Sequence, residues 1–380
     1  MSPSPYRMFV DRHFDEILGD LKAFVEVESP TTVKTAVDNA SRHLAARFAD
    51  TAAAEIVWHP QREWGDHFEA RIGRGPRRIL LLGHVDTVWP LGTIERLPCR
   101  IDGDRITGPG SFDMKAGDIQ ALWALRAVRE QSAAKDKTFV FFANTEEEAG
   151  SPTSRPIIES LARESECVLV LEPSVGSEGA VKLWRKGVGM FRLEVTGQAS
   201  HAGADPEKGR SAVLELARQI VDLYSAVPLA SAGTTMNVGV VRGGTRSNVV
   251  AASADAQIDL RVRTAAEAQR AQDAILKRPP FVPGTTVRVT GGLNRPPMEE
   301  TPASRRLYER ARAIAADEGF ELPAGGTGGG SDGNFTAALG VPTLDGLGAV
   351  GGGGHADTEH VRRETVAPRT AWFARVLAEL

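Results

Sequence analysis

The sequence predicts an α/β protein with a largely parallel, mixed sheet, interrupted by a smaller inserted α+β domain. Three short apolar runs (residues 79–82, 138–143 and 167–171) alternate with helix-like segments, as expected for strands buried on both faces of a parallel sheet. After about residue 185 apolar and polar residues alternate strictly, which is typical of strands with one solvated face. The 380 residues also exceed the roughly 250–300 at which a single core stops growing.

The first part of the larger domain is expected to span residues 1–184. Residues 11–27 place apolar side chains at helical spacing and predict an amphipathic opening helix, and residues 36–53 predict a second helix. The run 79–82 is too short for a helix and ends at Gly83, so it predicts a buried strand. Residues 118–130 predict a helix between this strand and the next two, at 138–143 and 167–171.

The insertion is expected at residues 185–297, where predicted elements follow the order β-α-β-β-α-β of a ferredoxin-like sandwich. Its strands are expected near residues 190–196, 235–244, 256–263 and 286–290, with helices at 212–224 and 265–276. Residues 298–380 then complete the larger domain. They predict a helix at 305–317, a glycine-rich segment, a short strand at 341–344 and a terminal helix from Pro368.

Composition and charge narrow the classes of partner. The formal net charge is -4, which argues against nucleic acid or an anionic membrane as the main partner. No window approaches the roughly 18 apolar residues of a membrane span, and the first 20 residues do not resemble a signal peptide, so the cytoplasm is expected. Only two cysteines occur, Cys99 and Cys167, so any metal would be held by histidine and carboxylates.

Potential metal ligands follow each of the three buried strands. His84 and Asp86 follow the first, Glu146, Glu147 and Glu148 the second, and Glu172 the third. Binding sites in open α/β sheets form outside the carboxyl ends of the strands, so we expect these side chains to converge. Asp113 in GSFDMKAG and His355 in GGGGHADTEH stand in glycine-flanked loops, and His360 competes with His355. Two histidines and three carboxylates suffice for two metal ions if one carboxylate bridges them, with a further glutamate as base.

These residues stand in strings that together resemble the M20 family of metallopeptidases, most closely its glutamate carboxypeptidase-like branch. The strings are HVDTV, GPGSFDMKAG, TEEEAGS, LEPS, SHAG and the late glycine-flanked His355, and they occur in the family's order over nearly the whole chain. One departure is Glu146, where the family usually has Asp at a position that is not a ligand.

The resemblance implies a role for each residue of the predicted site. His84 and Glu172 would hold one Zn²⁺, Glu148 and His355 the other, and Asp113 would bridge them; Co²⁺ or Mn²⁺ suits the same ligands. Glu147 would be the general base, and Asp86 would hydrogen-bond the imidazole of His84.

In the insert, the resemblance implies that His201 would reach the partner subunit's site in a homodimer and stabilise the oxyanion, with the insert acting as lid and dimer surface. Arg261 and Asn248 would bind the substrate's terminal carboxylate. Lys182 and Arg295 would extend this basic pocket, and Gly329 and Gly330 lie in a glycine-rich loop whose backbone would approach that carboxylate.

The predicted function is a di-zinc hydrolase that releases a C-terminal amino acid, first of all glutamate or aspartate, from an N-acyl or short peptidyl substrate. One alternative is an N-acyl amino acid deacylase or amide-conjugate hydrolase with another side-chain preference. A second alternative is a metal-dependent binding protein without activity, but such a protein would be expected to lack at least one of the residues that this chain retains.

Overall fold

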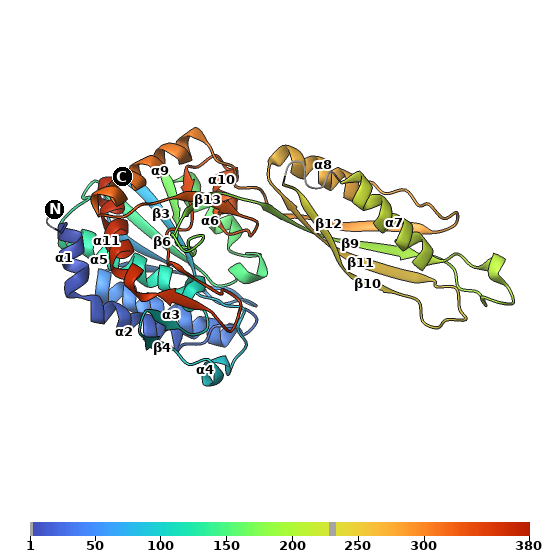
Figure 1. The fold of residues 1–380 in the computed structure, drawn as a ribbon, viewed down its shortest axis with the longest axis horizontal. Coiled ribbons are helices and arrows are strands. Elements are labelled where there is room, and N and C mark those ends of the chain that lie inside the picture. The colour runs from blue at the N-terminus through green and yellow to red at the C-terminus, as the bar shows by residue number, and fades with distance from the viewer. Residues whose placement is uncertain (1–2, 228–232) are drawn as a thin grey trace. The chain divides into compact units, whose positions relative to one another are not determined.

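The computed structural model describes residues 3–227 and 233–380, which form two compact units (Figure 1). Unit 1 comprises Met1–Trp184, Glu300–Thr327 and Ser331–Leu380, and unit 2 comprises Arg185–Glu299 with Gly328–Gly330. The chain therefore leaves unit 1 after residue 184 and returns to it at residue 300. None of the helices in the described ranges combines the length and the apolar character needed to cross a bilayer.

Unit 1 is built on a six-stranded mixed sheet with the order β1-β2-β6-β3-β7-β14. The strands are β1 (Glu55–His59), β2 (His67–Gly73), β3 (Arg77–His84), β6 (Lys137–Asn144), β7 (Cys167–Val170) and β14 (Thr343–Leu344). Strands β6, β3, β7 and β14 run parallel, whereas β1 and β2 pair antiparallel at one edge. The predicted α/β class with a mixed, largely parallel sheet is confirmed.

The central strands carry unbroken apolar runs because each face of the sheet is covered. Ile79 and Leu81 of β3 pack into the larger core, whereas Leu80 and Leu82 pack into a separate core on the other face. Successive strand residues point to opposite faces, so a run without polar residues is required here. The covering helices are α1 (Pro5–Arg12), α2 (Phe14–Val25), α3 (Lys34–Ala52), α5 (Ala116–Glu130), α6 (Arg155–Arg163), α9 (Pro302–Asp317), α10 (Gly333–Ala338) and α11 (Arg363–Glu379).

The remaining helices and strands of unit 1 are short. They are α4 (Thr93–Arg96), β4 (Arg100–Asp102), β5 (Arg105–Thr107), the helical turns η1 (Ser111–Lys115) and η2 (Glu147–Ala149), β8 (Val181–Arg185), β13 (Ala324–Thr327), β15 (Gly351–Gly352) and β16 (His360–Arg362).

Two predicted helix boundaries in unit 1 were wrong. The single opening helix predicted over residues 11–27 is instead two helices, because α1 ends at Arg12 and α2 begins at Phe14. The terminal helix predicted from Pro368 already begins at Arg363, with Pro368 inside it. Pro368 is the sixth residue of α11, so its missing N–H removes one intrahelical hydrogen bond just after the first turn.

Unit 2 has the predicted β-α-β-β-α-β order and a four-stranded antiparallel sheet, β10-β11-β9-β12. Its elements are β9 (Gly187–Thr196), η3 (Pro206–Lys208), α7 (Ala212–Ala226), β10 (Thr235–Gly243), β11 (Ser253–Val262), α8 (Ala265–Leu276) and β12 (Thr286–Arg295). Phe191, Leu193 and Val195 of β9 are buried with residues of α7 and α8, whereas Met190 and Arg192 are exposed on the other face.

Candidate metal centre

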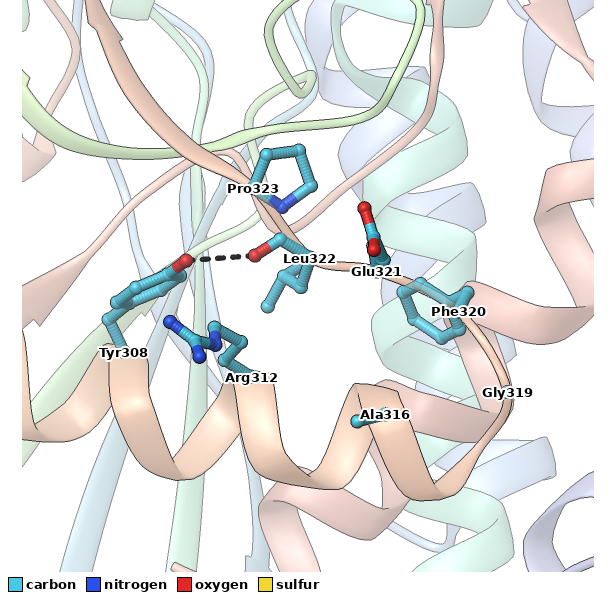
Figure 2. Close-up of a pocket in the computed structure, with 8 residues that line it drawn as sticks. All are labelled: Tyr308, Arg312, Ala316, Gly319, Phe320, Glu321, Leu322 and Pro323. Carbon is cyan, nitrogen blue, oxygen red and sulfur yellow. Dashed lines mark hydrogen bonds between the residues drawn. The ribbon is translucent and has the colours of Figure 1, made fainter.

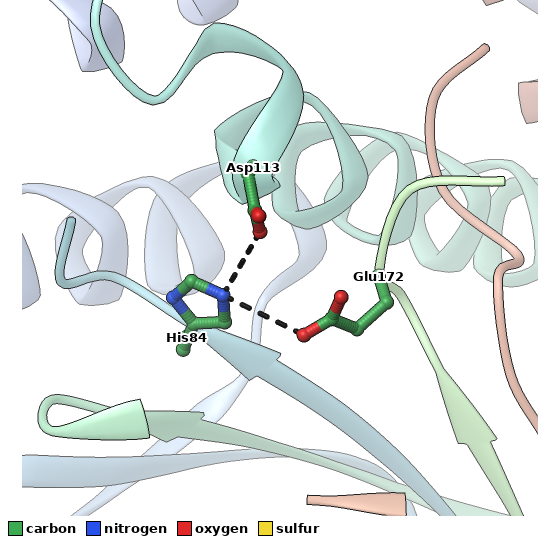
Figure 3. A group of neighbouring side chains, drawn as sticks. All are labelled: His84, Asp113 and Glu172. Carbon is green, nitrogen blue, oxygen red and sulfur yellow. Dashed lines mark ion pairs between the residues drawn. The ribbon is translucent and has the colours of Figure 1, made fainter. Parts of the chain in front are cut away.

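The first group of potential ligands lies at the carboxyl ends of β3 and β7. His84 is the last residue of β3, Glu172 follows β7, and Asp113 comes from the turn η1 before α5 (Figure 3). His84 Nε2 lies 3.3 Å from Asp113 Oδ1 and 3.7 Å from Glu172 Oε1. The His84 and Glu172 side chains are almost fully buried. One imidazole and two carboxylates therefore converge at a site with little exposure to solvent.

A second group uses the other oxygen of the same aspartate. His355 Nε2 lies 3.3 Å from Asp113 Oδ2 and 3.1 Å from Glu148 Oε1. In each group the potential ligand atoms lie within 4.8 Å of one another. The His355 side chain is about half exposed, so this group lies nearer to solvent than the first. A carboxylate that offers one oxygen to each group is what a bridge between two metal ions requires.

The unsatisfied polar atoms fit a pair of divalent cations. In the described parts of the chain, His84 Nε2 and Asp113 Oδ1 are buried and make no hydrogen bond, although they lie only 3.3 Å apart. Buried polar atoms without partners are costly, so atoms left in this state commonly face an ion or water. The two imidazoles and three carboxylates are nitrogen and oxygen ligands of the type that hold zinc.

The carboxylates hold both histidines in the charged form when no metal is bound. Burial lowers the pKa of His84, but the neighbouring carboxylates of Asp113 and Asp86 raise it well above the ordinary value. Hydrogen bonds to Asp113 and Glu148 raise the pKa of His355 to about 10. Burial opposes ionisation of Asp113, but its contacts with the two histidines hold its pKa well below the ordinary value. A cation that binds here must displace the imidazole protons.

Asp86 supports the site through both its backbone and its carboxylate. His84 Nδ1 lies 3.0 Å from the Asp86 carbonyl oxygen and 3.5 Å from its carboxylate, so the close contact with the imidazole is made by the main chain. The carboxylate accepts hydrogen bonds from the amides of Glu147 and Glu148, at 3.1 and 3.2 Å, and from Thr31 Oγ1 at 2.7 Å. Asp86 therefore fixes both the imidazole and the turn that carries the two glutamates.

The three consecutive glutamates have different surroundings. Glu146 is fully buried and turned inward, where its Oε1 accepts hydrogen bonds from Thr153 and the Ser154 amide. Burial raises the pKa of Glu146. Glu148 lies beside His355, and Glu147 begins the turn η2 with 9% of its surface exposed. Glu146 thus anchors the loop before α6, and Glu147 and Glu148 remain for chemistry.

Close packing of α5 fixes the end of β7. A Cβ on Gly117 would lie 2.0 Å from the carbonyl oxygen of Leu171, the residue before Glu172. Only glycine lets the helix approach this backbone, because any larger residue would clash with it. The sequence did not single out Gly117.

Two further residues near the ligands were not assigned a role from the sequence. Thr31 binds the carboxylate of Asp86, and Glu359 accepts a hydrogen bond from the amide of Asp113 at 3.0 Å. The only sequence signal for Glu359 is its position four residues after His355, and Thr31 has none because its contact spans 55 residues.

Lys182 is buried inside unit 1 with a relative side-chain exposure of 7%. Its Nζ lies 3.9 Å from Glu172 Oε2 and 3.7 Å from Asp345 Oδ1. The lysine therefore neutralises charge on the side of Glu172 that faces away from His84.

The insert residues predicted to bind substrate lie in unit 2. The structure brings His201 and Asn248 together, since the Asn248 carbonyl accepts a hydrogen bond from the Ala202 amide at 3.0 Å. His201 is exposed, and its Nδ1 accepts hydrogen bonds from the amides of Gly203 and Ala204. In neutral imidazole this places the proton on Nε2 as a donor.

The arginines predicted for the same pocket have partners within unit 2. Arg261 pairs with Asp259 through two parallel contacts, Nε to Oδ1 at 2.9 Å and Nη2 to Oδ2 at 2.8 Å. Arg295 is buried, and its Cδ would lie 2.7 Å from a Cβ on Gly330. The carbonyl oxygens of Gly329 and Gly330 accept hydrogen bonds from Arg185, at 3.4 and 2.9 Å. The glycine loop is thus tied to the base of the insert.

A hollow of about 670 Å³ elsewhere on unit 1 contains none of the predicted site residues. Residues from Tyr308 to Pro323, on α9 and the segment after it, line this hollow, and the Tyr308 hydroxyl donates to the Leu322 carbonyl at 2.9 Å (Figure 2). The potential metal ligands lie instead at the carboxyl ends of the sheet strands and in the neighbouring loops.

Comparison with known proteins gives one consistent result. Residues 80–379 match peptidase family M20/M25/M40. Carboxypeptidase G2 of Pseudomonas sp. (strain RS-16) is 31% identical over 321 residues, which cover 83% of this chain and 77% of that protein.

Two solved structures share the fold over nearly the whole chain. An M20 family metallo-carboxypeptidase from Sulfolobus solfataricus has a TM-score of 0.75 at 16% identity and covers 96% of this chain and 100% of its own. The Bacillus subtilis YXEP protein, described as a dinuclear metal binding peptidase, has a TM-score of 0.71 at 14% identity, with coverage of 97% and 98%.

Proposed function

This chain belongs to peptidase family M20/M25/M40 and is a hydrolytic enzyme, and from that premise we propose that it is a di-zinc carboxypeptidase. It would release a C-terminal amino acid from an N-acyl or short peptidyl substrate. The observation that carries the proposal is the pair of ligand groups that share Asp113, each with one histidine and one glutamate of its own. The expected preference is for a released glutamate or aspartate.

His84 and Glu172 would hold one Zn²⁺, Glu148 and His355 the other, and Asp113 both. Bound metal would supply Lewis-acid polarisation of the scissile carbonyl and acidify the attacking water. Co²⁺ or Mn²⁺ could take the same ligands.

Glu147 would act as the general base. Its backbone is fixed by the bond from its amide to Asp86 Oδ1, and its charge acts on nearby His84. It would take the proton from the attacking water and deliver it to the leaving amine. Proton transfer by a well-placed general base typically increases the reaction rate by about 10²–10⁴-fold.

Residues of the insert would recognise the substrate. Arg261 is oriented by its two contacts with Asp259, which leaves its remaining guanidinium donors to bind the substrate's carboxylate. Arg261 lies opposite Thr235 at one end of the β10–β11 pair, whereas Asn248 follows the other end, so Asn248 would reach the same carboxylate from the partner subunit, as proposed for His201. His201 would donate from Nε2 to the oxyanion, and Gly329 and Gly330 would bring bare backbone close to the substrate. Arg295 and Lys182 have weaker support, since both are buried.

A homodimer through the insert, with the insert also serving as a lid, completes the proposal. In the described part of unit 2, β10 is an edge strand that pairs with β11, and it exposes Val240 and Val241. Helix α7 exposes a second apolar set, Val213, Leu214, Val221 and Tyr224. An apolar edge strand invites pairing with another chain. Val241→Lys should give a monomer in sedimentation, whereas Met190→Lys, on the open sheet face, should leave the dimer intact.

Hydrolysis by metal-loaded protein tests the activity. A panel of N-acyl glutamate, aspartate, leucine and alanine should show release of the acidic amino acids at the highest kcat/KM. A preference of about tenfold or more for neutral residues would defeat the acidic assignment and favour the deacylase alternative, since tenfold corresponds to about 1.4 kcal/mol of discrimination.

Glu147→Gln separates an enzyme from a binding protein. It should lower kcat by about 10²-fold or more while leaving two metals per chain, because the base is distinct from the ligands. Glu178→Gln, an exposed control, should behave as wild type. Unchanged turnover in Glu147→Gln would reject the general base. Absence of a zinc anomalous signal between His84 and His355 would reject the metal assignment.

The cytoplasmic location also remains a proposal. It is supported by Cys99 and Cys167, which are both buried and unpaired, since disulfides are rare in reducing compartments.

A further inference from the structure

A single buried carboxylate gathers the backbone of the loop that carries Asp113. Glu359 is 4% exposed. Its Oε1 accepts hydrogen bonds from the amides of Phe112 and Asp113, at 2.9 and 3.0 Å. Its Oε2 accepts from the Gly110 amide at 3.1 Å and from Trp89 Nε1 at 2.8 Å. Four N–H donors thus satisfy one carboxylate, and three of them belong to one four-residue stretch.

The same glutamate is tied to the loop that carries His355. The Glu359 amide donates to the Ala356 carbonyl at 2.8 Å, and the Ala356 amide donates to the Gly353 carbonyl at 2.9 Å. His355 lies inside the turn from Gly353 to Ala356 with a φ of 63°, a left-handed conformation that is unfavourable for a residue with a side chain. The turn that holds His355 is therefore followed directly by the turn that ends at Glu359.

The strand after Glu359 adds a third connection. Strand β16 pairs antiparallel with β5, with His360 opposite Thr107. Strand β5 leads directly into the segment that contains Gly110 and Asp113. The two loops are thus joined by strand pairing at their base and by the Glu359 carboxylate beside the ligands.

We propose that Glu359 is a positioning residue that sets the placement of Asp113 relative to His355 and so controls affinity for the more exposed metal. This inference rests on the proposed metal site. Glu359 would not touch substrate or metal; it would act through the amides of the loop. Buried groups that orient ligands typically change metal affinity by about 10–100-fold when they are altered.

Glu359→Gln tests the inference because it keeps the shape but replaces one accepting oxygen by an NH₂ group, which faces N–H donors. Zinc affinities of the full-length protein would be measured by chelator competition, with stoichiometry by elemental analysis. The expected result is that one of the two metals binds about 10–100-fold more weakly. Glu364→Gln is the matched control, because Glu364 is an exposed glutamate of the same segment that pairs with Arg362, and it should bind both metals as wild type does.

The outcomes separate this inference from the proposed function. Two metals bound by Glu359→Gln with wild-type affinities would overturn the positioning role alone. Equal weakening of both metals together with a large loss of thermal stability would also overturn it, because that pattern indicates a general structural role. Wild-type protein that binds fewer than two metals would overturn the proposed function as well. If Glu359→Gln does not fold, Trp89→Phe removes one donor to the same carboxylate, and unchanged affinity there would overturn the inference.

Discussion

Thr31→Val should weaken both the fold and the active site, because Thr31 is the side-chain donor to a carboxylate that organises the metal centre. Thr31 Oγ1 donates to Asp86 Oδ2 at 2.7 Å, and Asp86 has no exposed surface. Valine has nearly the same shape but cannot donate, so Asp86 would keep only the amides of Glu147 and Glu148. A hydrogen bond to a charged group contributes about 1.5–3 kcal/mol to stability, and we expect a loss of about 2 kcal/mol.

Tryptophan fluorescence can follow this loss in unit 1 alone, since all 6 tryptophans lie there. In urea, with a slope of about 3 kcal/mol/M, a loss of about 2 kcal/mol lowers the midpoint by about 0.7 M in metal-free protein. In metal-loaded protein kcat/KM should fall about tenfold or more, since the turn carrying Glu147 loses part of its support. The control is the exposed neighbour Thr32→Val, expected within about 0.5 kcal/mol of wild type. Equal midpoints for the two variants would refute the reasoning.

Four more predictions follow from buried groups and close contacts. Burial lowers the pKa of His67 from 6.5 to about 4. Its contribution to the free energy of unfolding is therefore complete above pH 6.5, and up to about 3 kcal/mol is lost as the pH falls towards 4. His67→Gln should make the free energy of unfolding less dependent on pH in this range. Gly19→Ala should raise the free energy of unfolding by about 0.5–1 kcal/mol, because Gly19 is inside a helix with open space around it, and a lower free energy of unfolding would contradict this. Gly117→Ala should cost about 1–3 kcal/mol and reduce metal content, because the new methyl group meets the Leu171 carbonyl; wild-type metal content would contradict this. The raised pKa of His355, about 10, means that zinc must displace a proton, so affinity should increase from pH 7 to pH 9 with proton release in calorimetry, and a pH-independent affinity would contradict this.

The sequence was sufficient for the elements whose burial is uniform or strictly periodic. Strands β3, β6 and β7 were predicted because both of their faces are buried, and β9 because its faces alternate. Strand β1 was missed because EIVWH mixes charged and apolar residues without a clear period at the sheet edge. Strand β2 alternates Phe68, Ala70 and Ile72 with Glu69 and Arg71, so its period of two was a signal that the prediction overlooked. The break at His13 was missed because the apolar spacing continues across it.

For the candidate site, sequence spacing could propose ligands but not the contacts that hold them. His84, Asp113 and His355 stand in recognisable strings, and the structure groups them with the expected carboxylates. The inward turn of Glu146 depends on amides of the following loop, which no pattern in the sequence reveals. The pairing of Arg261 with Asp259 was foreseeable, since residues two apart on a strand share one face.

The two ends of the insert are joined to each other, and this has a consequence for how the enzyme folds. Arg185 and Met298 exchange two backbone hydrogen bonds of 3.1 Å, so the chain enters and leaves unit 2 at neighbouring points. Once unit 2 has folded, the polypeptide between β8 and α9 acts as a short connection, because its two ends are held together by the pairing of Arg185 with Met298. Pairing β14 with β7 then has the entropic cost of closing a much shorter loop. This cost increases only slowly with the number of residues in the loop. A chain in which residues 186–297 are replaced by a tight turn should therefore still assemble unit 1.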